Sequence, residues 1–263
     1  MQPILIGALL GDFCGAPYEF APERDPQKID LARADRCFTD DSVLTLAVAK
    51  ALLERRPYRD ALLELACRHP DCGFGARFYA MWVQARNPVP YGSYGNGAAM
   101  RVSPVAWACE TVPDLLREAE ASAACSHDHP AAIASAQATA LAIFLARKGQ
   151  DKAEIREALG ERFAYVFPDS LAELRALAAA SGFDATYRAV PQAIAAFLLT
   201  DSFLDCLRQT IALGCDADTQ AAIACAIAEA YYGVDDALAA QVRRALPPDL
   251  LQIHTAFCAR FAR

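Results

Sequence analysis

The fold is most readily inferred from the stretch Gly214-Cys215-Asp216-Ala217-Asp218-Thr219-Gln220, which runs directly into Ala221-Ala222-Ile223-Ala224-Cys225-Ala226-Ile227-Ala228-Glu229-Ala230. The second part is apolar almost all round a helix, which predicts a helix that is buried on every side. Its first turn would then be buried too, together with the carboxylates of Asp216 and Asp218. Because an unpaired buried charge is strongly unfavourable, these two acids need a partner.

A second acidic cluster lies far away in the sequence, at Phe38-Thr39-Asp40-Asp41-Ser42, again just before an apolar helical run. Thr, Asp and Ser are preferred at helix N-caps, so capping alone explains either cluster. The alternative is that the fold brings both clusters together around a divalent cation, which prefers hard oxygen ligands. Taken together, the two clusters favour the metal interpretation and indicate a metal-dependent hydrolase.

The composition indicates one sizeable globular domain. The chain has 263 residues, of which 55% are hydrophobic and 22% are charged, enough for a large core. Alanine is abundant and runs of β-branched residues are scarce, which favours helix over strand. We therefore expect a single all-α domain over residues 1–263. The formal net charge of -7 argues against a nucleic-acid partner, which usually requires a basic surface.

Hydrophobic periodicity predicts a bundle of many short helices and no strand. Irregular structure is expected at 22–37 and 87–97, where charged, Pro and Gly residues gather. The expected helices are 4–11, 42–54, 60–68, 75–85, 100–109, 112–122, 130–146, 152–159, 170–180, 190–199, 202–213, 219–231, 234–245 and 248–261.

Cysteine usage and the N-terminal residues favour a reducing compartment. The ten cysteines are irregularly spaced, form no Cys-x-x-Cys pair and lie mostly in apolar stretches. Residues 1–12 lack the basic start of a secretory signal, and Asp12 interrupts the apolar run early. No apolar segment reaches the roughly 20 residues that span a bilayer. We therefore expect a cytoplasmic protein with free thiols and no membrane partner.

Three further segments contain candidate site residues. Glu19 follows the first apolar helix, as an exposed loop residue or as a metal ligand or acid/base near the acidic clusters. The glycine-rich stretch 90–102 is either a tight turn or an anion-binding loop, suited to a diphosphate, ahead of a helix. His127 and His129 are too few for a zinc site. Their segment is interpreted as an N-cap loop, or, for His127, as a contact to a sugar or phosphate.

These segments resemble the motifs of the ADP-ribosylglycohydrolases, which include the dinitrogenase reductase-activating glycohydrolases and the ADP-ribosyl-acceptor hydrolases. The resemblance lies in Gly11-Asp12 through Glu19, Thr39-Asp40-Asp41-Ser42, Tyr94-Gly95-Asn96-Gly97-Ala98-Ala99-Met100-Arg101-Val102, Ser126-His127 and Asp216-Ala217-Asp218-Thr219. It extends from near residue 4 to near residue 232 and is strongest to short bacterial members. It implies an orthogonal all-α multi-helix bundle that hydrolyses the N- or O-glycosidic bond between ADP-ribose and an acceptor.

The resemblance also implies roles for individual residues. Two Mg²⁺ ions, or Mn²⁺ in their place, would be held by Glu19, Thr39, Asp40, Asp41, Asp216, Asp218 and Thr219. Catalysis would involve the carboxylates of Glu19, Asp41, Asp216 and Asp218, with acid and base unassigned. The substrate would be bound by Ser93, Tyr94, Gly95, Asn96, Gly97 and His127.

The sequence leaves more than one function open. The first is magnesium-dependent hydrolysis by a monomer acting on ADP-ribosylated proteins, with arginine as the favoured acceptor, or on other ADP-ribosyl conjugates. The second is a catalytically silent ADP-ribose-binding or structural relative. Loss of a ligand residue would favour this second function, but no residue of the implied ligand set is missing. A third possibility is a hydrolase of a small-molecule ADP-ribosyl conjugate.

Overall fold

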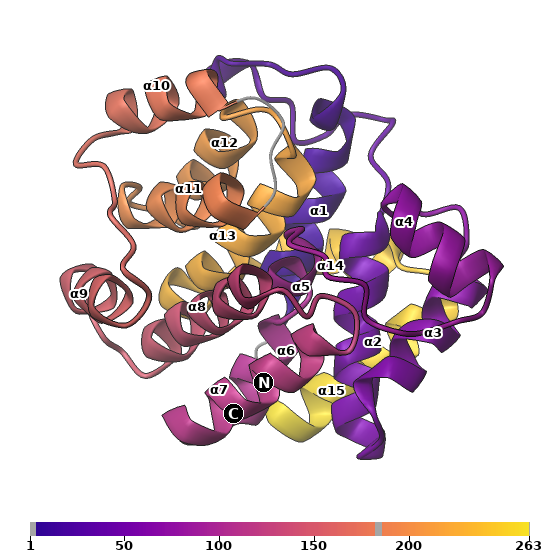
Figure 1. Ribbon diagram of the computed structural model, residues 1–263. Helices are drawn as coiled ribbons and strands as arrows, with labels where there is room; N and C mark the ends of the chain where they lie inside the picture. The colour runs from indigo at the N-terminus through magenta and orange to yellow at the C-terminus, as the bar shows by residue number, and fades with distance from the viewer. Residues whose placement is uncertain (1–3, 182–185, 263) are drawn as a thin grey trace.

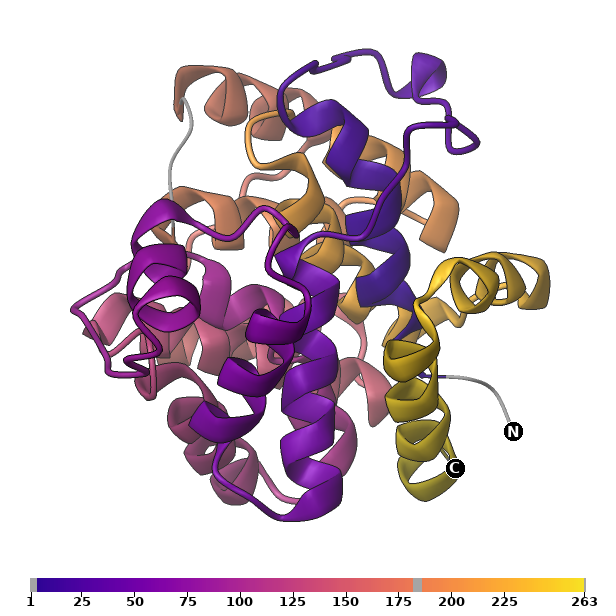
Figure 2. The same ribbon diagram turned by 90° about the vertical axis from the view of Figure 1, so that its right-hand side faces the viewer.

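The computed structural model describes residues 4–181 and 186–262, and within these ranges every regular element is a helix or helical turn (Figure 1). The all-α prediction is therefore confirmed. α2 stands vertically in both views, whereas α9 is seen end-on in Figure 1, so the helices cross at large angles (Figure 2). The elements are α1 (Ile6–Glu19), η1 (Pro26–Lys28), α2 (Asp40–Glu54), α3 (Tyr58–Arg68), α4 (Ala76–Phe78), the π-helical η2 (Tyr79–Gln84), α5 (Gly97–Met100), α6 (Ser103–Ala108), α7 (Val112–Ala124), α8 (Pro130–Arg147), α9 (Lys152–Phe163), α10 (Leu171–Ser181), α11 (Thr186–Leu198), α12 (Phe203–Ala212), α13 (Ala217–Tyr232), α14 (Asp236–Ala245) and α15 (Pro248–Phe261).

Most helix boundaries lie within a few residues of the prediction, and the largest difference is at α1. The expected helix 4–11 continues to Glu19, so Glu19 is the last residue of a helix and the expectation of a loop is wrong. The expected helix 100–109 is divided into α5 and α6. Pro104 explains this division, because it has no N–H to donate to the carbonyl of Met100 four residues earlier and its ring would clash with that carbonyl.

The most extensive helix pairing in the described chain joins α1 to α13. Three glycines of α1 lie against the α13 backbone. A Cβ atom on Gly7 would be 2.1 Å from Cys225 O, and one on Gly11 would be 2.3 Å from Ala221 O. On Gly15 it would be 2.6 Å from the Cα of Asp218. Only glycine permits this approach, since a Cβ at any of the three positions would lie inside van der Waals contact with main-chain atoms.

The order of these contacts makes α1 and α13 antiparallel. Gly7, Gly11 and Gly15 of α1 contact Cys225, Ala221 and Asp218 of α13 in turn, so the residue number rises along α1 as it falls along α13. The C-terminal end of α1, at Glu19, therefore lies beside the start of α13. At the opposite end, the backbone N–H of Ile6 donates to Glu229 Oε1 at 2.9 Å. Glu229 thereby satisfies one of the unpaired N–H groups in the first turn of α1. The two ends together fix how α1 is placed along α13.

Two expectations from composition can be compared with the fold. All ten cysteines are free thiols. One described helix, α8, is long and apolar enough to cross a membrane by length and composition alone, contrary to the expectation that no segment is. Because 61% of that helix is buried inside the protein, it has the character of a core helix of a globular bundle.

The glycine contact leads to a stability prediction. Gly11→Ala is expected to lower the free energy of unfolding by about 2 kcal/mol or more, because the added methyl group overpacks a main-chain contact. Thermal or denaturant unfolding measures the change. Gly160→Ala in α9 is the matched control, since its Cβ would meet its nearest atom at 3.5 Å. That control should be neutral or stabilising by up to about 1 kcal/mol. A Gly11→Ala protein as stable as the wild type would contradict the role given to this contact.

Candidate active site

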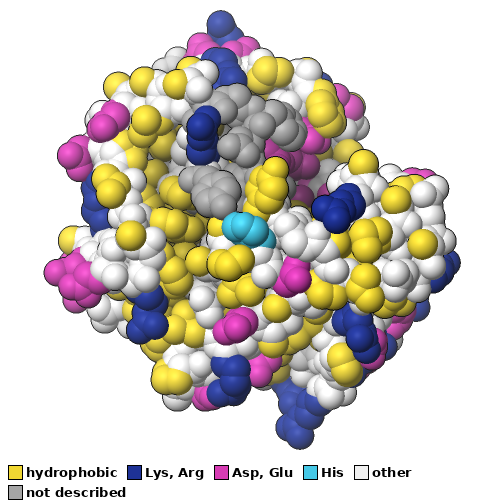
Figure 3. Space-filling view, in the orientation of Figure 1, with side chains coloured by type: hydrophobic (Ala, Val, Ile, Leu, Met, Phe, Trp, Pro, Cys, Tyr) yellow, Lys and Arg dark blue, Asp and Glu magenta, His cyan; other side chains and the backbone are white. Residues whose placement is uncertain are grey.

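All the residues expected to hold metal or ligand line a single cavity of about 460 Å³. Figure 3 shows acidic side chains gathered in a hollow on this face of the molecule. The cavity lies where the C-terminal end of α1, the N-terminal ends of α2 and α13, and the loop before α5 come together. The expected residues that line it are Glu19, Thr39, Asp40, Asp41, Ser93, Tyr94, Gly95, Asn96, Gly97, His127, Asp216, Asp218 and Thr219.

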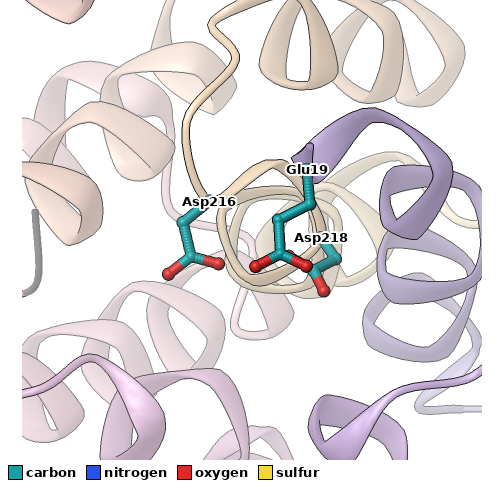
Figure 4. A group of neighbouring side chains, drawn as sticks. All are labelled: Glu19, Asp216 and Asp218. Carbon is teal, nitrogen blue, oxygen red and sulfur yellow. The ribbon is translucent and has the colours of Figure 1, made fainter. Parts of the chain in front are cut away.

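Three carboxylates form the centre of this cavity. One oxygen from each of Glu19, Asp216 and Asp218 lies within 4.8 Å of the others, and Figure 4 shows the three side chains converging. Asp216 is the N-cap of α13, yet its side chain makes no capping hydrogen bond. α13 begins at Ala217, so Asp218 lies in its first turn. The helix start itself directs both aspartates towards Glu19.

The two acidic clusters meet directly between Asp41 and Thr219. The hydroxyl of Thr219 donates to Asp41 Oδ2 at 3.0 Å. Asp41 is only 2% exposed, and its Oδ1 has no hydrogen-bond partner in the described parts of the chain. Thr39 caps α2 by accepting from the backbone N–H of Asp41 at 3.2 Å. Capping is therefore confirmed at α2 and the two acidic clusters are in contact, whereas metal binding by the unpartnered Oδ1 of Asp41 stays a prediction.

Asp12 is a site residue that the sequence analysis did not assign. It is completely buried in α1 and accepts hydrogen bonds from the backbone N–H and side-chain hydroxyl of Thr39, the hydroxyl at 2.8 Å. It also accepts from the backbone N–H of Ser42 at 3.1 Å and from the Ser42 hydroxyl. Asp12 therefore attaches the start of α2 to α1. A lone acid within the apolar run of residues 4–14 was the available signal, because such a residue needs a buried partner.

The acidic cluster is electrostatically uncompensated by protein cations. Burial raises the pKa of Asp40 to about 8, and the negative charges of Asp12 and Asp216 act in the same direction. Burial and the neighbouring acids also raise the pKa of Asp41 and Asp218 well above the ordinary range. Within residues 4–181 and 186–262, no lysine or arginine forms a salt bridge with these carboxylates.

This donor set fits hard divalent cations. It consists of carboxylate and hydroxyl oxygens, and it includes the unpartnered buried Oδ1 of Asp41. Mg²⁺ and Mn²⁺ prefer such oxygen ligands, and their charge would offset the repulsion between the buried acids. Zinc typically takes histidine or cysteine ligands, and neither residue type belongs to the group of converging carboxylates.

The glycine-rich loop forms another part of the cavity wall and is joined to the acidic cluster. The side-chain amide of Asn96 donates to Asp216 Oδ2 at 2.6 Å. Ser93 accepts from the backbone N–H of Gly95 at 3.2 Å, which closes a tight turn. Tyr94 is 53% exposed, and its ring meets the ring of His129 edge-on at 5.9 Å. The loop is therefore both a turn and a wall of the pocket.

Two arginines of the cavity were not assigned from the sequence either. Arg77 is exposed, and its guanidinium carbon lies 4.9 Å from the centre of the Tyr91 ring. Arg101 is completely buried behind the loop. Arg77 carries no distinctive sequence signal, since it precedes Phe78 within an ordinary helical pattern. Arg101 closes the glycine-rich motif, and a charged residue beside Met100 and Val102 was the signal that could have identified it.

Comparison with known proteins agrees with this geometry. The family described as ADP-ribosylglycohydrolase matches residues 2–261. The chain belongs to this family. It is 28% identical to the ADP-ribosylhydrolase ARH3 of Bos taurus, over 88% of this chain and 84% of that protein. It is 29% identical to the ADP-ribosyl-[dinitrogen reductase] glycohydrolase of Rhodospirillum rubrum, over 88% of this chain and 85% of that protein.

A solved structure of an ADP-ribosylglycohydrolase-related protein complex shares the fold. The TM-score is 0.70 at 24% identity, and the match covers 98% of this chain and 96% of that one. The family, the all-α bundle and the class of enzyme predicted from the sequence are therefore confirmed, and this member of the ADP-ribosylglycohydrolases is a hydrolase of ADP-ribose conjugates. The roles of the individual site residues stay predictions.

The buried acids lead to a pH prediction for the protein in a chelator. The pKa of Asp40 is 3.8 in its ordinary state and about 8 in the folded protein. The free energy of unfolding therefore contains a contribution from protonated Asp40 that is fully present below about pH 4 and is lost as the pH rises to about 8. Asp40→Asn cannot ionise, so it should gain stability relative to wild type over that range. Thermal unfolding in EDTA measures this difference, with the exposed Asp236→Asn as control. A difference that does not change with pH would contradict the assignment.

Proposed function

We propose that this protein removes ADP-ribose from a modified protein side chain by hydrolysing the glycosidic bond, with Mg²⁺ as cofactor and arginine as acceptor. The observation that carries the proposal is the convergence of Glu19, Asp216 and Asp218 within 4.8 Å, beside the buried Asp41. Oxygen clusters of this kind serve metal-assisted hydrolysis. The single domain, the monomeric state and the cytoplasmic location stay predictions.

The cation site would use residues from both acidic clusters. The proposed metal ligands are Glu19, Thr39, Asp40, Asp41, Asp216, Asp218 and Thr219. Bound divalent cations supply polarisation of an attacking water and of sugar oxygens. Thr219 orients the carboxylate of Asp41 through its 3.0 Å hydrogen bond, and Asn96 orients that of Asp216. Glu19, Asp41, Asp216 and Asp218 provide the oxygens that accept and return protons during hydrolysis.

The charges of the pocket support a cationic acceptor. In the proposed complex, the glycosidic bond to be cleaved would lie next to the bound divalent cations and therefore next to the acids of the cavity wall. Two of these acids, Glu19 and Asp216, are only partly buried. A guanidinium group attached to the distal sugar would face these carboxylates favourably. The adenosine diphosphate part carries two negative charges and is disfavoured there. It would instead occupy the glycine-rich wall, on which Arg77 is the exposed cation.

The central prediction concerns turnover. Wild-type protein with Mg²⁺ should release ADP-ribose from an arginine-modified protein, and Asp218→Asn should reduce the rate by at least about 100-fold because it removes one ligand charge. The circular dichroism spectrum of the variant should still be that of a helical protein, and the exposed Asp236→Asn serves as control. The same assay is run on a protein ADP-ribosylated on serine and on small-molecule ADP-ribosyl conjugates. Tight ADP-ribose binding without release from any conjugate would instead identify a silent binder.

Arg77 leads to a separate prediction about binding. Arg77→Ala should weaken ADP-ribose binding by about tenfold, which is the scale of one charge-assisted hydrogen bond to phosphate. The affinity of Arg77→Lys should lie between those of the wild type and Arg77→Ala. Calorimetric titration measures the affinity. The exposed Arg244→Ala in α14 lies outside the cavity lining and should bind as wild type does. Equal affinities for Arg77→Ala and Arg244→Ala would show that Arg77 does not contact the ligand.

A further inference from the structure

A buried arginine supports the wall of the cavity that contains His127. Arg101 is completely buried, and its Nη2 donates to the backbone oxygen of Ser122 at 2.9 Å and to Ser126 Oγ at 2.7 Å. A guanidinium group has only donors, so Ser126 Oγ must accept in this contact. The single proton of the Ser126 hydroxyl is therefore free to point elsewhere.

The hydroxyl of Ser126 has a specific acceptor within reach. Ser126 Oγ lies 2.8 Å from His127 Nδ1, and both side chains are buried. Ser126 Oγ could accept a second hydrogen bond, but His127 Nδ1 is the one acceptor recorded for its proton within the described chain, so we assign the hydroxyl as donor to Nδ1. A neutral imidazole with Nδ1 as acceptor carries its proton on Nε2. Burial, and then the charge of Arg101, lowers the pKa of His127 well below its usual range, which keeps the ring neutral.

The other ring nitrogen faces the glycine-rich loop. A Cβ on Gly97 would lie 3.0 Å from His127 Nε2, and one on Gly95 would lie 3.6 Å away. The absence of side chains at these two positions leaves room beside Nε2 in the cavity. Within the described chain, Nε2 makes no hydrogen bond, whereas Nδ1 is held by Ser126.

We propose that Arg101 and Ser126 are positioning residues that hold His127 in the Nε2–H tautomer, as a neutral donor to an oxygen of the ligand on the glycine-rich loop. The identity of the ligand, a nucleoside diphosphate sugar, rests on the proposed function; the tautomer does not. A neutral donor binds a phosphate or hydroxyl oxygen without adding charge to a wall that already contains a buried guanidinium. Both recorded hydrogen bonds of the buried guanidinium are made by Nη2, whereas Nε and Nη1 have no partner within the described chain.

The tautomer can be measured without any ligand. In ¹⁵N NMR of the wild-type protein at pH 7, the His127 ring should show a protonated Nε2 and an unprotonated Nδ1. The chain has four histidines, and the signal lost in His127→Asn identifies the ring. Ser126→Ala should lose this preference and weaken ADP-ribose binding about tenfold. Ser122→Ala is the matched control, because its hydroxyl donates to Ala119 O and its backbone oxygen still accepts from Arg101.

The outcomes separate this inference from the proposed function. An Nδ1–H tautomer or an imidazolium in the wild type would overturn it, whatever the activity. So would unchanged binding and an unchanged tautomer in a folded Ser126→Ala. If Ser126→Ala does not fold, the wild-type spectrum alone decides. If the wild type shows the Nε2–H tautomer but hydrolyses no conjugate, the proposed function fails and the positioning role of Ser126 stands.

Discussion

The close approach of α1 to α13 is the constraint on which the site depends. Gly7, Gly11 and Gly15 allow backbone-to-backbone contact, and the contact is antiparallel. The C-terminal end of α1 therefore lies beside the N-terminal end of α13, which brings Glu19 to Asp216 and Asp218. A side chain at any of the three positions would separate the helices. The geometry of the acidic cluster is thus determined along the whole length of the helix pair, well away from the acids themselves.

Asp12 extends the same framework to the third helix. It lies on α1 one residue after Gly11, so the face that packs on α13 is next to the side chain that attaches α2. Its hydrogen bonds to Thr39 and Ser42 position Asp41 beside Thr219. The first turn of α2 and the first turn of α13 are thereby brought together by one helix. A divalent cation between them would complete an arrangement whose acids otherwise repel one another.

The cavity combines an oxygen-rich wall with a wall of contrasting chemistry. The acids are paired with no protein cation within the described chain, whereas the glycine-rich wall has Arg77 at its surface and Arg101 behind it. Asn96 connects the two walls through Asp216. This division suits a substrate that is anionic at its diphosphate and has a cationic or polar acceptor near its distal sugar. His127 also lines the cavity and is connected to the buried guanidinium of Arg101 through Ser126.

The sequence by itself determined the helical class, most helix boundaries and the local motifs, because periodicity, capping residues and glycine-rich turns are properties of short segments. It could not show that the acidic clusters at Asp40-Asp41 and Asp216-Asp218 meet, since capping alone explains either cluster. Nor could it extend α1 to Glu19, assign Asp12, or connect Arg101 to His127 through Ser126. Only the tertiary structure decided these points, because each depends on contacts between segments that are distant in the chain or on a buried partner with no local signature.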